Sequence, residues 1–264
     1  MSATDVVSVL IQASPFYLLA AIVAVRARTL AREGRPVPAG RLLLIAAGVA
    51  VGVAADLPPI GTQSDERLSI HMVQHMLIGD VAAFLIAVGL TGPMLRPILT
   101  VRGIRRLRVL AHPLVAVPLW VVVYYGWHIP VLYDAALNTT AVHTLEHFSF
   151  AAAGLLYWWH LLSPIRSRLR LGGMGPIAYM GVTKILVGFL GIALAFAPEL
   201  IYDAYDHPGK IWGMTALDDQ HVAGLIMALE QSIVMGIALA WLFARMLSES
   251  EEEERRAERY STTP

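Results

Sequence analysis

The chain has 264 residues, of which 56% are hydrophobic and only 15% are charged, a balance too apolar for an ordinary soluble domain. Its 20 basic and 20 acidic side chains cancel, so no excess of positive charge points to a nucleic-acid partner. It contains no cysteine, which excludes disulfides, thiolate metal sites and thiol redox chemistry. Any bound metal must therefore be held by His, Met, Asp or Glu.

Seven apolar segments are long enough to cross a bilayer core of about 30 Å, which takes roughly 20 helical residues. They cover residues 6–27, 41–57, 69–92, 111–128, 140–163, 174–198 and 219–246. The second segment stops at Asp56-Leu57-Pro58-Pro59, because proline cannot continue a helix. The sequence predicts an all-α fold, with a seven-helix transmembrane domain over residues 1–247 and a charged tail over residues 248–264.

Arginine is concentrated in alternate loops, and this asymmetry predicts the orientation of the chain in the lipid bilayer. The first, third and fifth loops and the tail are rich in arginine, whereas the opposite loops are acidic and hold only Arg67 and Lys210. Basic loops remain on the cytoplasmic side. We therefore expect an external N-terminus and a cytoplasmic C-terminus.

Two pairs of histidines, each pair spaced four residues apart, open the third and fifth predicted helices. The pairs are His71 with His75 and His143 with His147. Helical spacing places both members of a pair on one face, where two imidazoles can hold one metal ion. Both helices begin outside, so the pairs lie at equal depth near the external face. We predict a metal site there, with His128 or His221 completing it.

Sulfur-bearing and acidic side chains accompany these histidines. Met72 and Met76 follow the adjacent stripe of the third helix, and they either pack the core or supply soft thioether ligands suited to Cu(I). Glu146 lies within the second histidine pair and is expected to orient one imidazole from behind.

Three charged residues, Asp80, Lys184 and Glu230, fall near the middle of their spans, where an uncompensated charge is costly. We expect Lys184 to pair with Glu230 or Asp80, either as a structural lock or as a step in an ion or proton path. Glycines on the sixth helix, namely Gly181, Gly188 and Gly191, can pack helices within the chain or in a homo-oligomer.

Several motifs occur in one order between Ile70 and Leu242. They are His71-x-x-x-His75-Met76, Gly89-x-x-Gly92-Pro93, Trp127-His128-x-Pro130, His143-x-x-Glu146-His147 and Asp219-Gln220. With these motifs the chain resembles the CtaG-type cytochrome c oxidase assembly family of polytopic bacterial membrane proteins. The resemblance implies a seven-helix, multi-pass protein of the bacterial plasma (inner) membrane that helps to mature haem–copper oxidases and is linked to copper supply. The implied partners are a haem–copper oxidase subunit or a copper chaperone.

The leading hypothesis is a copper-binding assembly protein without enzymatic turnover, and zinc is the other ion that such a site accepts. One alternative is a membrane b-type cytochrome, with one haem held by His128 and His147 and another by His112 and His160. Another is a metal-ion or proton transporter that uses the three mid-depth charged residues. A zinc hydrolase with Glu146 as the base is the weakest alternative.

Overall fold

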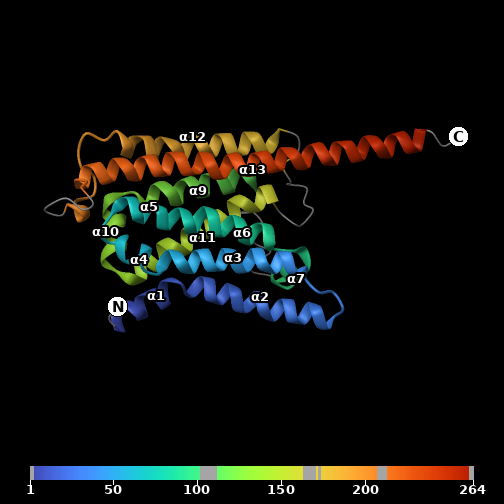
Figure 1. Cartoon of the computed structure of the whole chain (residues 1–264), viewed down its shortest axis with the longest axis horizontal. Helices are drawn as coiled ribbons and strands as arrows, with labels where there is room; N and C mark the ends of the chain where they lie inside the picture. Colours follow the sequence, from blue (N-terminus) through green and yellow to red (C-terminus); the bar gives the residue numbers. More distant parts are fainter. Residues whose placement is uncertain (1–2, 102–111, 163–170, 172–173, 207–212, 262–264) are drawn as a thin grey trace.

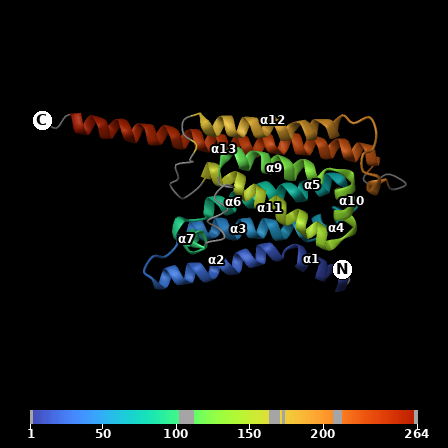
Figure 2. The same cartoon turned by 180° about the vertical axis from the view of Figure 1, so that it is seen from behind.

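The computed structural model describes residues 3–101, 112–162, 171, 174–206 and 213–261. The long helices of this part of the chain lie side by side in one bundle, and none of its elements is a β-strand (Figures 1 and 2). The longer elements are α2 (Ser14–Arg32), α3 (Ala39–Asp56), α5 (Leu68–Met76), α9 (Pro113–Trp127), α11 (Thr140–Leu162), α12 (Gly175–Ala195) and α13 (Ala216–Ser261). The shorter elements are α1 (Ala3–Gln12), α4 (Ile60–Gln63), η1 (Leu77–Ala82), α6 (Ala83–Gly89), α7 (Gly92–Thr100), α10 (Pro130–Asn138) and η3 (Asp203–Tyr205). The all-α prediction is confirmed.

Helices α1, α2 and α3 occupy one edge of the bundle, and α12 and α13 occupy the other (Figures 1 and 2). The predicted first segment, 6–27, is not one helix: α1 ends at Gln12, and α2 begins at Ser14. Pro15 explains the break, because proline suits the first turn of a new helix and cannot continue an existing one. The break leaves α1 free to lean onto α11.

The third predicted span is continuous from Leu68 to Gly89, but its middle is not an α-helix. Residues Leu77–Ala82 form a π-helix between α5 and α6. Turns of this kind are rare, and they occur frequently at functional sites. The π-helix contains Asp80 and begins directly after Met76.

Small residues let α11 approach the π-helix closely. A Cβ added at Gly154 would overlap the carbonyl oxygen of Gly79. A Cβ at Gly79 would lie 3.3 Å from the Trp120 ring and 3.6 Å from Phe150, so the requirement for glycine at this crossing is strict at Gly154 and weaker at Gly79. The crossing sets the distance between the histidines of α5 and those of α11.

Within the described part of the chain, five helices are long and apolar enough to cross a membrane, or six if the bent pair α9 and α10 counts as one span. These helices are compatible with a multi-pass membrane protein. The five do not include α11, although it has 23 residues and runs through the bundle. Its histidines and Glu146 are polar and lower its mean hydropathy. They are tolerated in this helix because they are buried in the protein interior and do not face lipid. The prediction of seven spans is therefore met only in part.

Helix α13 extends well beyond the rest of the bundle (Figures 1 and 2). It is helical through Ser261, so most of the predicted tail continues the last helix, with Arg255 bonded to Glu251 at 3.0 Å. The arginine-rich stretches 102–111 and 163–170, together with His207 and Lys210, lie outside the described residues.

The glycines of α12 divide into two groups. Gly191 packs against Gly224 of α13, whereas a Cβ added at Gly181 or Gly188 would meet nothing within 4 Å. Of the three glycines, only Gly191 therefore has a close helix-packing contact with another described residue.

Candidate metal centre

The start of α5 is held against α13 by a side-chain cap. The backbone N–H of Ser69 donates to Oδ2 of Asp219 at 3.2 Å, and the Ser69 hydroxyl donates to Oδ1 of the same carboxylate. The first N–H groups of a helix lack partners within the helix, so a carboxylate here stabilises the end. The cap fixes the position of α5 along the bundle axis relative to α13, and with it the position of His71 and His75.

The two predicted histidine pairs face each other across the crossing of α5 and α11. Within the pairs, ring centroids lie 4.3 Å apart for His71 and His75 and 4.2 Å apart for His143 and His147. Between the helices, His71 stacks on His143 at 5.4 Å, and His75 meets His147 edge-on at 5.4 Å. All four are buried. The tertiary structure thus brings both pairs into one cluster.

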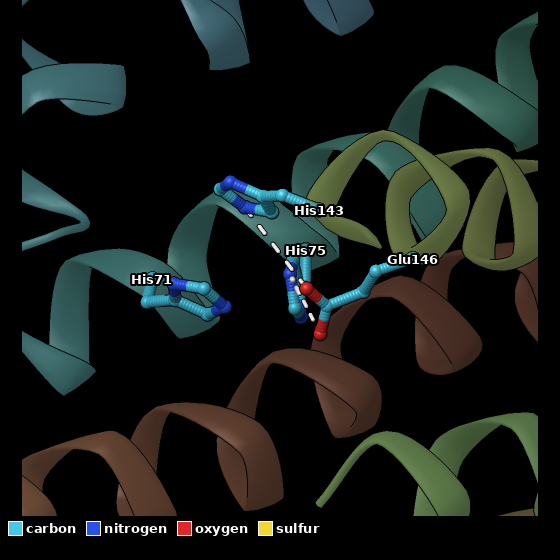
Figure 3. Close-up of side chains that lie close together, drawn as sticks. All are labelled: His71, His75, His143 and Glu146. Atoms are coloured by element: carbon cyan, nitrogen blue, oxygen red, sulfur yellow. Dashed lines mark ion pairs between the residues drawn. The ribbon is translucent and has the colours of Figure 1, made fainter. Parts of the chain in front are cut away.

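Glu146 lies inside this cluster. Its Oε1 is 3.5 Å from Nε2 of His75, and its Oε2 is 4.0 Å from Nε2 of His143 (Figure 3). Spacing of three residues puts Glu146 and His143 on the same face of α11. Its carboxylate points among the imidazoles, where it can act as a metal ligand itself or, as predicted, orient an imidazole.

One ligand atom from each of His71, His75, His143 and Glu146 can be chosen so that all four lie within 4.8 Å of one another (Figure 3). Both ring nitrogens of His71 and His75, Nε2 of His143 and both oxygens of Glu146 are buried without a hydrogen-bond partner. Burying such groups without partners costs roughly 1–3 kcal/mol each. Three imidazoles and one carboxylate match the type and number of ligands that a four-coordinate transition metal takes. We call these four residues the His–Glu cluster.

His147 has a different environment from the His–Glu cluster. Its Nδ1 lies 3.0 Å from Oδ1 of Asp56, the last residue of α3, and both side chains are buried. The Gln74 amide donates to the same oxygen at 3.3 Å and to the carbonyl of Ala55 at 3.1 Å. A carboxylate behind an imidazole sets the ring orientation and raises its basicity as a ligand. Asp56 therefore holds His147 against the rings of His75 and His143.

Neither Asp56 nor Gln74 was singled out as a site residue from the sequence. In the sequence Asp56 ends an apolar segment just before Leu57-Pro58-Pro59. The sequence offered one clue to a role for Asp56. It is an acidic residue at the end of an apolar helix, and the prolines that follow set the direction of the backbone there.

Gln12 at the end of α1 contacts the cluster from another side. Its amide nitrogen is placed 3.1 Å from Nδ1 of His143. The two ends of an amide are interchangeable in shape. With Oε1 facing the ring instead, Gln12 accepts a hydrogen bond from the Nδ1–H and leaves Nε2 of His143 free for a metal. This contact exists because the chain breaks at Ala13.

Tyrosines cover the cluster at the end of the bundle that carries α4 and α10. The ring of Tyr133 lies 5.0 Å from that of His71, and its hydroxyl is 3.0 Å from the hydroxyl of Tyr205. Tyr205 donates to the carbonyl of Ser64, and Tyr202 donates to the carbonyl of His128, each at 3.0 Å. Burial raises the pKa of the Tyr205 phenol, so it stays neutral and remains a donor. These tyrosines close the cluster toward the loops.

The two histidines proposed to complete the site are not part of the His–Glu cluster. His221 lies with Nε2 2.9 Å from the carbonyl of Ala197. His128 lies with Nδ1 2.6 Å from the carbonyl of Tyr124, and it lines a small cavity together with Met72, Met76, Asp80 and His75. His75 therefore belongs to both the cluster and the cavity.

The other histidines and the mid-depth charges have separate roles. His112 accepts from the backbone N–H of Leu114 and caps α9, and Nδ1 of His160 lies 2.9 Å from the carbonyl of Leu156. Lys184 donates to the carbonyl of Ala228 at 2.6 Å. Among the described residues no ion pair within 4.0 Å joins it to Glu230 or Asp80, but Lys184 and Glu230 are close enough to interact electrostatically, so the predicted pairing stays a prediction.

The chain was compared with protein families, curated proteins and solved structures. The model of the family described as cytochrome c oxidase caa3 assembly factor (Caa3_CtaG) matches residues 16–249. The chain belongs to this family. No curated protein and no solved structure matches it. The family match spans the whole His–Glu cluster, whereas Gln12 lies before its first residue. The resemblance inferred from the motifs is thereby confirmed.

Proposed function

We propose that this chain binds copper at the His–Glu cluster and supplies it during assembly of a cytochrome c oxidase, without enzymatic turnover. The observation that carries the proposal is the convergence of three buried imidazoles and one buried carboxylate within 4.8 Å. Membership of an oxidase assembly family supports copper, because haem–copper oxidases need copper to mature. The implied partners are an oxidase subunit or a copper chaperone, and zinc is the competing ion.

The charges around the cluster support a divalent ion. Glu146 and Asp56 are both buried, and together they contribute two carboxylates beside neutral imidazoles. Buried charges are tolerated when they are paired or bound to metal. The two positive charges of a Cu²⁺ or Zn²⁺ ion balance the two negative charges of these carboxylates. A site made of neutral histidines alone would leave the charge of the ion uncompensated.

We further propose seven spans in the bacterial plasma membrane, with the N-terminus outside. The five apolar helices, the bent pair α9 and α10, and α11 together make seven. In the sequence, arginine-rich loops alternate with the acidic loops that adjoin the histidine-bearing helix ends, and basic loops remain cytoplasmic. Copper would then enter from the external side, where α4, α10 and the tyrosines lie.

Elemental analysis of detergent-purified protein, with an absorption spectrum, tests this proposal. In protein loaded with Cu(II), we expect about one copper per chain in the wild type and its loss in a His71→Ala/His143→Ala double variant. The matched control, His112→Ala/His160→Ala, also removes two imidazoles, but from rings that contact backbone groups outside the cluster, and we expect it to keep the metal.

Unchanged metal content in the His71→Ala/His143→Ala variant would show that the cluster is not the site. If the purified protein contains zinc, and the zinc is lost in the same double variant, the proposed site stands but its ion is zinc and not copper. Iron with a Soret band would replace the proposal with the b-type cytochrome. A strain lacking the chain should assemble an oxidase that is deficient in copper, and the double variant should fail to restore it.

A further inference from the structure

A small cavity adjoins the His–Glu cluster on the side of the π-helix. Its volume is about 10 Å³, which is room for a single ion or water. The lining side chains that could bind an ion are Met72, Met76, Met227, His75, His128 and Asp80. They come from α5, η1, α13 and the residue after α9, so the cavity lies where four segments meet.

The cavity is rich in thioether sulfur. Met72 and Met76 lie four residues apart on one face of α5, and Met227 reaches in from α13. Each of the three is at most 7% exposed. Methionine often fills gaps in a core beside aromatic rings, and thioethers alone would need no further explanation. Thioethers grouped with imidazoles, however, form a soft ligand set that favours Cu(I).

The two imidazoles of the cavity have nitrogens available for a ligand. Nδ1 of His128 lies 2.6 Å from the carbonyl of Tyr124, which leaves Nε2 buried without a hydrogen-bond partner. His75 has no hydrogen-bond partner on either ring nitrogen. Buried polar groups in proteins are nearly always satisfied. Both rings line the cavity, so an ion inside it would supply the missing partner.

The charge of the cavity differs from that of the cluster. Asp80 is buried, and no ion pair links it to a cation among the described residues. Asp80 is the one carboxylate that lines the cavity, although Glu230 is near enough to interact with it electrostatically, and one monovalent cation balances the charge of Asp80. The His–Glu cluster instead contains Glu146 and adjoins Asp56, which lies behind His147. The rare π-helix at Leu77–Ala82 places Asp80 at this wall of the cavity.

We propose that the cavity is a second metal position, separate from the His–Glu cluster, that binds a soft monovalent ion of the Cu(I) type through Met72, Met76 and Met227 with His128. His75 borders both positions, so an ion can pass between them with one ligand kept. The proposal adds a second metal position to the function proposed above. The cavity can bind an ion even if the cluster binds none.

Silver is the probe for this position, because Ag(I) is soft and monovalent like Cu(I) and undergoes no redox change. We expect the purified full-length protein to bind about one Ag(I) with sulfur neighbours in its X-ray absorption spectrum. A Met76→Leu/Met227→Leu variant should lose this ion, because leucine fills the same space without a donor.

The matched control is Met180→Leu/Met235→Leu, which changes two buried methionines of another core cluster outside the cavity. It should retain the silver, and thermal unfolding should show that both variants are folded. Equal silver uptake in Met76→Leu/Met227→Leu and wild type, or silver without sulfur neighbours, would overturn the proposal.

The cluster variant separates this proposal from the function proposed above. His71→Ala/His143→Ala should still bind Ag(I), since neither residue lines the cavity. Silver lost from Met76→Leu/Met227→Leu, with copper unchanged in His71→Ala/His143→Ala, would support the cavity while removing the cluster. Silver lost from both variants would show a single site and overturn the inference.

Discussion

Two helix contacts in this molecule are both close approaches at glycine, but they differ in what they bring together. One is the crossing of α11 with the π-helix, and the other is the pairing of α12 with α13. In the first, a Cβ at Gly154 would overlap the carbonyl of Gly79; in the second, a Cβ at Gly224 would overlap the carbonyl of Gly191. Glycine is needed at both places because the two backbones approach too closely for any side chain.

The two contacts differ in their polar groups. Along α12 and α13, the ammonium of Lys184 is satisfied by the carbonyl of Ala228. Where α11 meets α5 and η1, the imidazoles and Glu146 are buried facing one another, with nitrogens and oxygens left unbonded. Close packing alone therefore does not mark a site. What distinguishes the candidate centre is a set of metal-binding groups that the surrounding protein leaves without partners.

The largest effect should separate these two glycine contacts. Gly154→Ala and Gly191→Ala each force a Cβ against backbone, and we expect each to lower the free energy of unfolding by about 1–3 kcal/mol. Only Gly154→Ala should also lose the copper, because it moves His143 and Glu146 away from α5. Thermal unfolding and metal content measure the two effects. Loss of copper in both variants, or in neither, would contradict this distinction.

A smaller effect is expected for the residue behind His147. Asp56→Asn removes the carboxylate that lies 3.0 Å from Nδ1 of His147, and we expect copper affinity to fall. Residues that orient a ligand typically contribute about 10–100-fold to metal affinity. Competition with a copper chelator measures it, with the exposed Asp203→Asn as the control. Equal affinity in Asp56→Asn and wild type would mean that His147 takes no part in the centre.

The smallest effect is expected at Lys184. Lys184→Met removes a bond to the Ala228 carbonyl, so we expect a stability change of about 1 kcal/mol and no change in copper content. Metal analysis and thermal unfolding check this in the same preparations. Loss of copper would show that the α12–α13 pair is coupled to the centre and would erase the contrast between the two regions.

Local patterns were sufficient to predict much of this molecule. Apolar runs predicted helices with nearly the bounds of α3, α11 and α12, because a membrane-spanning helix consists of about 20 mostly apolar residues that are consecutive in the sequence. Spacing of four residues placed His71 beside His75 and His143 beside His147, because it repeats every turn of a helix. The motifs also identified the family correctly.

Other features depend on contacts between residues far apart in the chain. No local pattern places Asp56 beside His147, Gln12 beside His143 or Met227 beside Met72 and Met76. The break at Ala13 and the π-helix also went unpredicted, because single-residue changes in helical register leave little trace in hydropathy.

The sequence by itself determined which helices carry the candidate metal ligands and at which turn of each helix they lie, since helical periodicity is local. Only the tertiary structure decided that Glu146 lies among the imidazoles, that Asp56 lies behind one of them and that Lys184 bonds to backbone. Those outcomes depend on how closely the helices approach one another. The glycines that set this distance do so because a side chain there would collide with the neighbouring helix, and their own helix gives no sign of that contact.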